Sequence, residues 1–320
     1  MEKIFYIIDA IDKTGSITRT SQLLHLTVPA VSIAIKKEEH LVGQPLLDRL
    51  SKPLKLTDTG RLYLQYFKKA KLLDDDLQKE LNDLQNGLVG TLRLGGTQYI
   101  NSFFLPGPLS SFISSYPKVK IDLKEGSADS IREDLHNGII DLCISSAEFS
   151  QSEYEALPAF ADEIVLAVPK SFPVTADYKK QSFSSDDLKD RNFDITVLKS
   201  VDLKKFENIP FILLSAQNDL YRRTVGFLDR KKIDCKPILQ PDQMVTACHL
   251  ADAGIGATFI SDRLVKQVLP KNLLFFRLGF AECFRQFWVL TDKKRYQSVI
   301  TRKFIELLCR GASSHEGVSL

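Results

Sequence analysis

Three polar or basic side chains near the start of the sequence have the types and spacing that a DNA contact needs. Ser32 and Lys36 are four residues apart, so on a helix they share one face, whereas Val31 and Ile35 turn toward the helical core. Hydroxyl groups can bond base edges, and hydroxyl or ammonium groups can hold phosphates. We therefore predict that Ser32 contacts a base and that Thr27 and Lys36 contact phosphates. The same spacing also fits a small helical subdomain in which these side chains are merely solvated.

A second set of polar residues follows the ends of four predicted strands farther along the chain. Ligands of two-lobed α/β folds bind where strand ends meet helix N-termini, because backbone N–H groups are free there. None of these residues is Lys or Arg, which favours a small neutral ligand or an anion held by backbone groups. Serine and threonine at such positions are also common helix caps. The candidate effector contacts are Thr97, Gln98, Ser127, Ser146, Ser215 and Gln217.

Residues that could support catalysis or bind a metal are scattered. Cys248 and His249 are neighbours, and adjacent side chains on a helix diverge by about 100°, so they do not form a nucleophile–base pair. The acidic run 74–76 has no second ligand cluster nearby and fits a solvated helix face. Glycines at 95–96 and 254–256 match neither a phosphate loop nor a dinucleotide fingerprint. We expect no catalytic residues, no cofactor and no metal.

Composition limits the classes of protein to which the chain can belong. At 320 residues it is about twice a common domain length of roughly 150, which predicts several domains. With 44% hydrophobic residues, 26% charged residues and a net charge of +3, it is typical of a globular protein and not of a disordered or membrane-embedded one. The five cysteines form no C-x-x-C pair and no export signal is visible, which predicts a cytoplasmic protein with reduced thiols.

A framework of short helices must position the first set of residues. Apolar residues at helical spacing predict a helix that ends near Lys13 and a second helix over 18–25. Thr27 can cap a third helix, in which Pro29 occupies the first turn, where its missing N–H has no cost. This order of helix, tight turn and helix is typical of a unit that places one helix in the major groove of DNA.

A small hairpin and a long helix follow these three helices. Residues 45–56 alternate apolar and polar positions around a Ser-Lys-Pro turn, as a wing does, and Arg49, Lys52 and Lys55 make this segment basic. From residue 57 to Leu88, tyrosine and leucine recur every three or four positions, nearly as in a coiled-coil seam, and Gly87 and Gly90 are expected to end this helix. Such a stripe predicts a partner helix and therefore at least a dimer.

Buried strands alternate with helical segments in the rest of the chain. This alternation predicts a parallel α/β sheet with right-handed crossovers. The region is longer than a common domain, so we expect two lobes, with the chain crossing between them near Phe160 and again near Val268. The predicted strands are 91–94, 119–123, 141–144, 163–168, 211–214, 256–260 and 287–290.

Motifs in a fixed order run through most of the chain. In the first part they are Ser16–Thr18, Leu23–Leu24, Pro29–Ser32, Ile35–Lys37, Gly43–Arg49 and Leu56–Gly60, and later they are Glu125–Ser127, Leu135–Gly138, Ile140–Leu142 and Ala253–Gly256. Together these motifs resemble the LysR-type transcriptional regulators over roughly residues 2–305. The first group resembles that family's winged helix-turn-helix, and the second group resembles its effector-binding region.

The sequence departs from the family pattern at five positions. Thr20 and Ser21 stand where the family usually has two alanines, and Leu47 replaces a usual phenylalanine. Val28 and Ile33 occupy positions of the recognition helix that are commonly polar. We expect the fold to tolerate these changes and base contacts to be atypical. The predicted DNA-binding residues are Thr18, Thr27, Pro29, Ser32, Lys36, Arg49 and Lys52.

The resemblance implies an α+β multi-domain chain with three parts. These are a winged helix-turn-helix DNA-binding domain over 1–60, a linker and dimerisation helix over 61–90, and a two-lobed α/β, periplasmic-binding-protein-like effector domain over 91–320. Lobe I is expected to take about 91–160 and 269–320, and lobe II about 161–268. The resemblance also implies a homodimeric or homotetrameric regulator of transcription that binds a pseudo-palindromic operator in double-stranded DNA and is controlled by a small-molecule effector.

Two other classes of protein share part of this pattern. A soluble solute-binding protein without a DNA-binding role would explain the two lobes, but it needs an export signal and has no use for residues 1–60. An enzyme needs a convergent acid, base or nucleophile, and the sequence shows none. We therefore predict a sequence-specific DNA-binding regulator that is not an enzyme and has no membrane partner.

Overall fold

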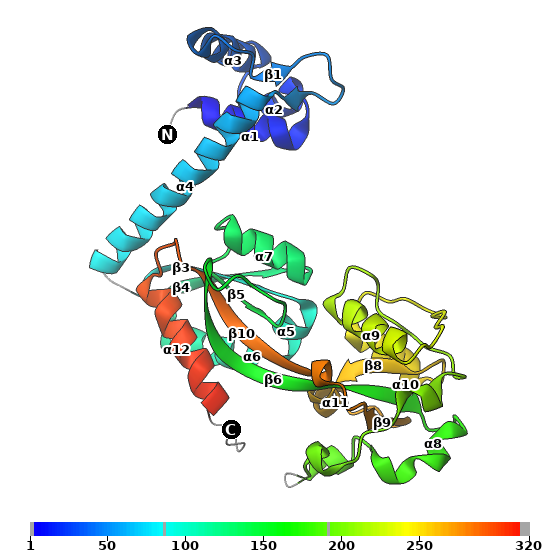
Figure 1. The fold of residues 1–320 in the computed structure, drawn as a ribbon. Helices are drawn as coiled ribbons and strands as arrows, with labels where there is room; N and C mark the ends of the chain where they lie inside the picture. Colours follow the sequence, from blue (N-terminus) through cyan, green and yellow to red (C-terminus); the bar gives the residue numbers. More distant parts are fainter. Residues whose placement is uncertain (1–2, 86–87, 191–192, 314–320) are drawn as a thin grey trace. The chain divides into compact units, whose positions relative to one another are not determined.

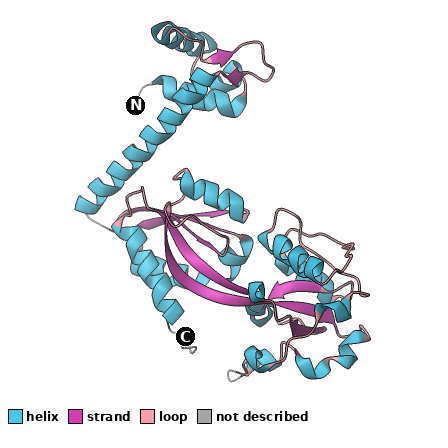
Figure 2. Cartoon of the chain, in the orientation of Figure 1, coloured by secondary structure: helices cyan, strands magenta, loops and turns pink. Residues whose placement is uncertain are grey.

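The chain folds into two compact units, Met1–Leu81 and Asn82–Leu320. This architecture is seen in a computed structural model that describes residues 3–85, 88–190 and 193–313 (Figure 1). The smaller unit is built mainly from helices, whereas the larger unit combines helices with long strands (Figure 2).

Three helices form the core of the smaller unit, and each is bounded by the residues that the sequence suggests. Ser16 and Thr27 each accept a hydrogen bond from a backbone N–H three residues later, so they cap α2 and α3. Gly43 ends α3 in the left-handed conformation (φ 71°), which favours glycine. Isoleucines of the first helix pack against Val31 and Ile35. The helices are α1 (Lys3–Thr14), α2 (Ile17–Leu23) and α3 (Val28–Val42).

A two-stranded wing and a long helix complete this part of the chain. In the wing, β1 (Leu47–Asp48) pairs antiparallel with β2 (Lys55–Leu56), and the buried side chains of Leu47 and Leu56 lie in register. Leu47 therefore fills the core position at which the family pattern has a larger ring. The long helix, α4 (Asp58–Gln85), begins where the sequence predicts, while Gly87, one of its predicted stops, lies outside the described residues.

The first lobe of the larger unit is built on five strands in the order β4-β3-β5-β10-β6. Helix α12 packs on β6 and α6, whereas α7 packs on β3, β5 and β10. The strands are β3 (Gly90–Gly96), β4 (Val119–Glu125), β5 (Leu142–Ser145), β6 (Tyr154–Pro169) and β10 (Phe284–Asp292). The helices are α5 (Gln98–Phe103), α6 (Pro106–Ser115), α7 (Ala128–His136) and α12 (Val299–Ser313).

The second lobe shares strand β6 with the first lobe, and this long strand runs through both (Figure 1). Beyond the junction, β6 pairs with β8 and β9, and β9 pairs with β7. The strands of this lobe are β7 (Ser182–Phe183), β8 (Thr258–Ser261) and β9 (Leu273–Arg277), and its helices are α8 (Val174–Asp177), α9 (Asp219–Arg230), α10 (Met244–Asp252) and α11 (Asp262–Val268). Short 3-10 helices span Lys179–Gln181, Asp187–Lys189, Ile195–Val197, Leu203–Phe206 and Ala281–Cys283.

The sheet is mixed, so the prediction of a parallel sheet is wrong for most of its strands. Among the described strands, only the pairs β3–β4 and β3–β5 are parallel. Strand β10 is antiparallel to β5 and β6, and β6 is antiparallel to β8 and β9. The reason is that the chain crosses to the second lobe along β6 and begins its way back at β10, directly beside β6. The sequence reasoning assumed a helical crossover at each step.

Two further expectations differ from the structure. The predicted strand 211–214 forms only the isolated bridges Phe211–Ala257 and Ile212–Leu239, although its apolar side chains are buried. Strand β9 lies in the second lobe, paired with β6 from Val165 to Pro169. The expected return to lobe I at residue 269 therefore falls inside the second lobe of the structure, and the strand pairing puts the return after Arg277.

Candidate nucleic-acid interface and ligand cavity

Helix α3 presents a polar and apolar face that is open to solvent. Thr27, Pro29 and Lys36 are exposed and Ser32 is half-buried, whereas Val31 and Ile35 are buried beneath them. The Thr27 hydroxyl accepts a bond from the Ala30 backbone N–H (3.3 Å), so this residue is a cap as well as a predicted phosphate contact. The structure thus brings four predicted residues, Thr27, Pro29, Ser32 and Lys36, onto one accessible helix.

The other three predicted DNA contacts lie outside this helix. Thr18 is exposed on α2, and Lys52 is exposed in the wing turn. Arg49 forms an ion pair with Glu39 of α3 (2.8 Å), and a second oxygen of that carboxylate accepts the Leu46 backbone N–H (3.0 Å). Glu39 therefore links the wing segment to α3, and its ion pair holds the Arg49 side chain beside that helix.

Two unusual hydroxyl residues are buried in the helix-turn-helix and have partners. The Thr20 and Thr14 hydroxyl oxygens are 2.8 Å apart, and the Thr14 hydroxyl also lies 2.8 Å from the Ala10 carbonyl. Ser21 donates to the Thr18 carbonyl (2.8 Å). Because buried polar groups without partners are costly, these bonds explain how the fold tolerates hydroxyls where alanines are usual.

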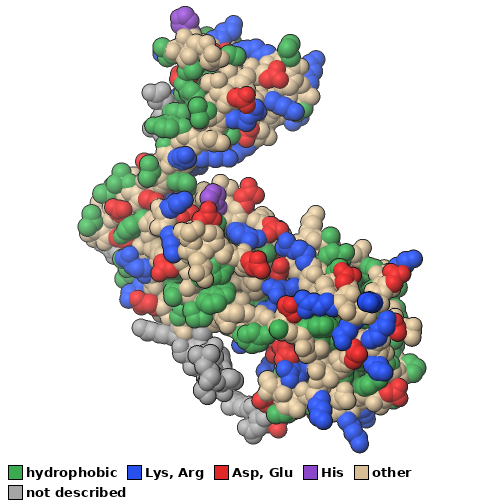
Figure 3. Space-filling model, in the orientation of Figure 1, with side chains coloured by type: hydrophobic (Ala, Val, Ile, Leu, Met, Phe, Trp, Pro, Cys, Tyr) green, Lys and Arg blue, Asp and Glu red, His purple; other side chains and the backbone are tan. Residues whose placement is uncertain are grey.

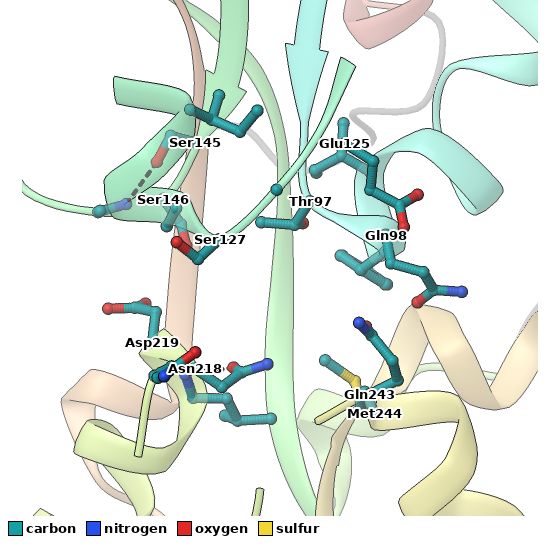
Figure 4. Close-up of a pocket in the computed structure, with 18 of the residues that line it drawn as sticks. Thr97, Gln98, Glu125, Ser127, Ser145, Ser146, Asn218, Asp219, Gln243 and Met244 are labelled. Atoms are coloured by element: carbon teal, nitrogen blue, oxygen red, sulfur yellow. Dashed lines mark hydrogen bonds between the residues drawn. The ribbon is translucent and has the colours of Figure 1, made fainter. Parts of the chain in front are cut away.

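A cavity of about 320 Å³ lies between the two lobes of the larger unit. All six predicted effector contacts line it, although they come from loops as far apart as residues 97 and 217. Figure 4 shows polar side chains of the first lobe, among them Thr97 and Ser127, facing Asn218 and Gln243 of the second lobe across the space. The sequence rule that strand ends meet at one edge therefore located the walls of the cavity.

The six residues differ in how much of their hydrogen-bonding capacity is already used. The Ser127 hydroxyl accepts the Ser130 backbone N–H (3.2 Å) and so caps α7. Thr97 occupies the cap position of α5 but makes no side-chain cap bond. Gln98 donates to Ser102 (3.2 Å), while its Oε1 atom is buried with no hydrogen-bond partner among the described residues. A ligand with a donor group can satisfy that oxygen.

Sequence reasoning missed several residues of the cavity wall. Asn218 caps α9 through its side chain, which accepts the Leu220 backbone N–H (3.0 Å), and Gln243 precedes α10 without a side-chain cap bond. The acidic residues Glu125, Asp219 and Asp242 also line the cavity. Asn218 and Gln243 carried a usable signal, because a polar residue of this kind is common directly before a helix, as each of them is before α9 and α10.

Arg285 is the single Lys or Arg among the described lining residues, and it is already paired. Its Nε and one terminal nitrogen lie 2.7 Å and 2.5 Å from the two oxygens of Asp162, and both side chains are buried. Tyr99 donates to the same carboxylate (3.0 Å) and also contacts the Ser261 hydroxyl (3.0 Å). Burial, followed by the charge of Asp162, raises the pKa of Tyr99 above its ordinary value, so its hydroxyl stays protonated.

This network links the lobes at the floor of the cavity. Tyr99 belongs to α5 of the first lobe, Ser261 ends β8 of the second, and Asp162 and Arg285 face each other across β6 and β10 at the junction. Beside it, the Asp262 carboxyl accepts the Glu163 backbone N–H (2.9 Å). Burial raises the pKa of Asp262 to about 6.

The alternative chemistries have no geometric support in the described residues. Cys248 is fully buried in the core, and burial raises the pKa of its thiol to about 12, which disfavours the thiolate that a nucleophile needs. Asp75 and Asp76 lie 2.9 Å and 4.0 Å from Lys79 on the surface of α4. Over residues 3–85, 88–190 and 193–313, no three acidic, His or Cys side chains gather as a metal site would need, and no helix could span a membrane.

Family profiles match nearly the whole chain. The profile of the bacterial regulatory helix-turn-helix protein, lysR family, matches residues 4–61, and that of the LysR substrate binding domain matches residues 85–312. The chain belongs to the LysR family. It is therefore a DNA-binding transcriptional regulator with an effector-binding domain, and the predicted family, fold class and function are confirmed.

Relatives and solved structures agree with this assignment. Probable RuBisCO transcriptional regulators of Synechocystis sp. and Cyanophora paradoxa are 26% and 27% identical, over 97% and 94% of this chain and 86% and 88% of theirs. The structure of full-length CbnR complexed with target DNA superposes with a TM-score of 0.64 at 18% identity, covering 98% of this chain and all of that one. The regulatory domain of Synechocystis CcmR in complex with 2-PG gives 0.59 at 18% identity, over 71% of this chain and 99% of that one.

Proposed function

We propose that this LysR-family regulator reads its operator with α3 and the wing. Lys36 and Lys52 neutralise phosphates, the half-buried Ser32 hydroxyl bonds a base edge, and Thr18, Thr27 and Arg49 hold the backbone of the DNA. The observation that carries this assignment is the exposed face of α3. Thr27 caps this helix, and Glu39 links it to the wing. On the visible face of the effector unit, basic and acidic side chains lie interspersed, so no continuous basic surface competes there (Figure 3).

Two copies of the chain pair through α4 in this proposal. The helix exposes a stripe of large apolar side chains at spacings of three, four and seven residues, and none of them is buried within one chain: Leu62, Tyr66, Leu73, Leu77, Leu81 and Leu84. A second copy of the same helix can cover this stripe as in a coiled coil. The resulting two-fold symmetry fits an inverted repeat in the DNA. The structure neighbour CbnR was crystallised at full length in complex with its target DNA.

The cavity between the lobes is the effector site in this proposal. Thr97, Ser146, Ser215 and Gln217 point neutral polar groups at the ligand, and Gln98 Oε1 accepts a hydrogen bond from it. The first turns of α5 and α10 offer backbone N–H groups that lack side-chain caps, so they can donate to an acceptor on the ligand. The proposed effector is therefore a small polar molecule that carries both donors and acceptors.

Regulation follows from the position of the cavity. A ligand that contacts both lobes stabilises one setting of the lobes over others, and the difference in affinity for the two settings drives the switch. The Tyr99–Asp162–Arg285 network lies where the two lobes meet, so it must be retained or rearranged when that setting changes. We also propose that the protein acts in the cytoplasm, on DNA, and without enzymatic turnover.

Selection from a randomised duplex library tests the DNA assignment. The full chain is expected to enrich an inverted repeat, with affinity that falls steeply as salt rises. The variant Lys36→Glu is expected to lose this enrichment while the chain remains folded and dimeric by sedimentation. A folded dimer that enriches no sequence would contradict the proposal and favour a solute-binding role.

Thermal shifts against a panel of small polyols, hydroxy acids and amino acids test the effector site. Once a ligand is found, Ser146→Ala and Ser215→Ala are each expected to weaken it about threefold to tenfold, because each removes one neutral hydrogen bond. Ser114→Ala is the matched control, since that hydroxyl bonds the Ser110 carbonyl on α6, away from the cavity. Equal weakening by all three variants would place the ligand elsewhere.

A further inference from the structure

The N-terminal half of the recognition helix α3 carries two large apolar side chains that are exposed. Ile33 is 65% exposed and Val28 is 41% exposed, although each lies within one turn of residues assigned to DNA contact. Ile33 follows Pro29 by four residues and precedes Lys36 by three, so these three side chains lie on one face of the helix. Ile33 lies about 100° around the helix from Ser32, so it faces a neighbouring part of the groove.

An isoleucine or valine side chain has no hydrogen-bond donor or acceptor. Opposite a polar base edge, such a side chain would displace water from the edge without replacing the lost hydrogen bonds. This cost disfavours a base with a polar edge at that position. The thymine C5-methyl group is the apolar group that base pairs present in the major groove. Contact with it removes apolar surface of both partners from water.

We propose that Ile33, assisted by Val28, reads thymine methyl groups and makes thymine a requirement in each operator half-site. The inference rests on the DNA-contacting face of α3 proposed above. At 100° per residue, Val28 lies about 40° to one side of Ser32 and Ile33 about 100° to the other side, so the two apolar contacts flank the base contact of Ser32. Five residues span about 7.5 Å along the helix, which is roughly the height of two base-pair steps.

The charged surroundings of the helix commit these side chains to DNA and not to a protein partner. Lys36 and Lys37 follow Ile33 within one turn and are exposed, and the wing adds Lys52. Two exposed apolar side chains beside Lys36 and Lys37 do not make the broad apolar patch that a protein interface needs, whereas they fit a groove lined by phosphates.

Uracil scanning of the selected operator tests this inference. Each thymine is replaced in turn by deoxyuridine, which removes one methyl group and changes no hydrogen bond, and the affinity of the full chain is measured at fixed salt. We expect a loss of about threefold to fourfold at one or two positions per half-site, the effect of burying one methyl group. In Ile33→Ala the loss at one of these positions is expected to vanish, and in Ile33→Val it is expected to be intermediate.

Leu41→Ala is the matched control, because Leu41 is an equally exposed apolar residue (69%) two turns farther along α3. It is expected to keep the wild-type response to deoxyuridine. A wild-type protein that binds its operator with no response at any thymine would overturn the inference and leave the proposed DNA face intact. The same holds if Ile33→Ala retains every response at full size. A wild-type protein that binds no sequence would overturn both.

Discussion

The two units of the chain differ in how far along the sequence some of their buried polar groups find partners. In the DNA-binding unit the partners are close in sequence, since Thr20 lies beside Thr14 and Ser21 bonds Thr18. In the effector unit the buried Asp162 carboxylate is held by Tyr99 and Arg285, which are 63 and 123 residues away. The first framework can form as soon as its helices form, whereas the second exists only when both lobes are folded and joined.

The same contrast separates the two functional surfaces. The DNA-contacting face is one stretch of exposed helix, whose parts keep their places through local capping. The ligand cavity is assembled from loops between residues 97 and 287, and no single loop forms a site. A substitution on α3 should therefore alter binding alone, while one at the junction of the lobes should alter stability as well.

The largest effect is expected when the buried ion pair at the junction is broken. Arg285→Met leaves the Asp162 charge buried without its partner, which should lower the free energy of unfolding by about 3–5 kcal/mol. Urea titration followed by the fluorescence of Trp288, the single tryptophan of the chain, measures it. Arg230→Met is the matched control, because Arg230 and Glu282 form a similar two-point pair that is exposed, and little change is expected. Equal losses would show that burial of the pair is not decisive.

Two helical glycines, one in each unit, should respond to alanine with opposite signs. A Cβ at Gly60 would lie 2.2 Å from the Leu46 carbonyl oxygen, so Gly60→Ala must shift backbone at the start of α4 and should cost about 1–3 kcal/mol. A Cβ at Gly226 in α9 would meet no atom within 4 Å, and Gly226→Ala should stabilise by up to about 1 kcal/mol. Thermal melting followed by helical circular dichroism compares both with wild type. A stabilised Gly60→Ala variant would contradict the tight packing of α4 on the wing.

The junction of the lobes should also carry a pH dependence. Because burial raises the folded-state pKa of Asp262 to about 6, above an ordinary value of about 3.9, the folded chain holds this proton more tightly. Its contribution to stability is therefore full below about pH 4 and is lost as the pH rises through 6. Asp262→Asn should remove this fall, which amounts to about 3 kcal/mol between the two profiles.

A control of opposite sign is available in the same lobe. Bonds from the Thr196 hydroxyl and backbone N–H lower the pKa of Asp194, so its contribution is present above its ordinary pKa and is lost as the pH falls. Asp194→Asn should therefore alter the acid side of the profile and leave the region near pH 6 unchanged. If both variants alter the same region, Asp262 is not the group responsible.

The smallest effect is expected on the exposed face of α3. Lys36→Ala should reduce the slope of log affinity against log salt by about one and should leave the urea midpoint of the effector unit unchanged. Lys13→Ala is the control, because that ammonium already pairs with Asp9 (2.6 Å) on α1. An unchanged slope in Lys36→Ala would remove Lys36 from the phosphate contacts.

Sequence alone predicted the DNA-binding unit well because its signals are local. Thr27, Pro29 and Gly43 mark the ends of α3 by rules that need no distant partner. In the effector unit, the rule that strand ends carry ligand contacts placed Thr97 and Ser215 on the same cavity, yet it could not supply Arg285. An arginine in a mostly apolar strand suggests a buried partner, but the identity of that partner, Asp162, depends on the pairing of β10 with β6.

The errors in the effector unit have the same origin. The apolar run 211–214 has the composition of a buried strand, and it is buried, but its neighbours supply only isolated bridges. Direction within the sheet is likewise set by how the chain returns from the second lobe, and hydrophobic periodicity does not encode that choice.

The residue at which the chain leaves the first lobe lies next to the residue at which it returns. Glu163 on β6 faces Phe284 on β10 as a cross-strand pair, so their Cα atoms are roughly 5 Å apart. Everything between them is one uninterrupted stretch of gene, residues 164–283, which carries Ser215, Gln217 and Gln243 of the cavity wall. A single recombination event can therefore replace about a third of the cavity-lining residues while the operator-reading helix is inherited unchanged. Diversity of effectors can in this way evolve separately from the choice of promoter.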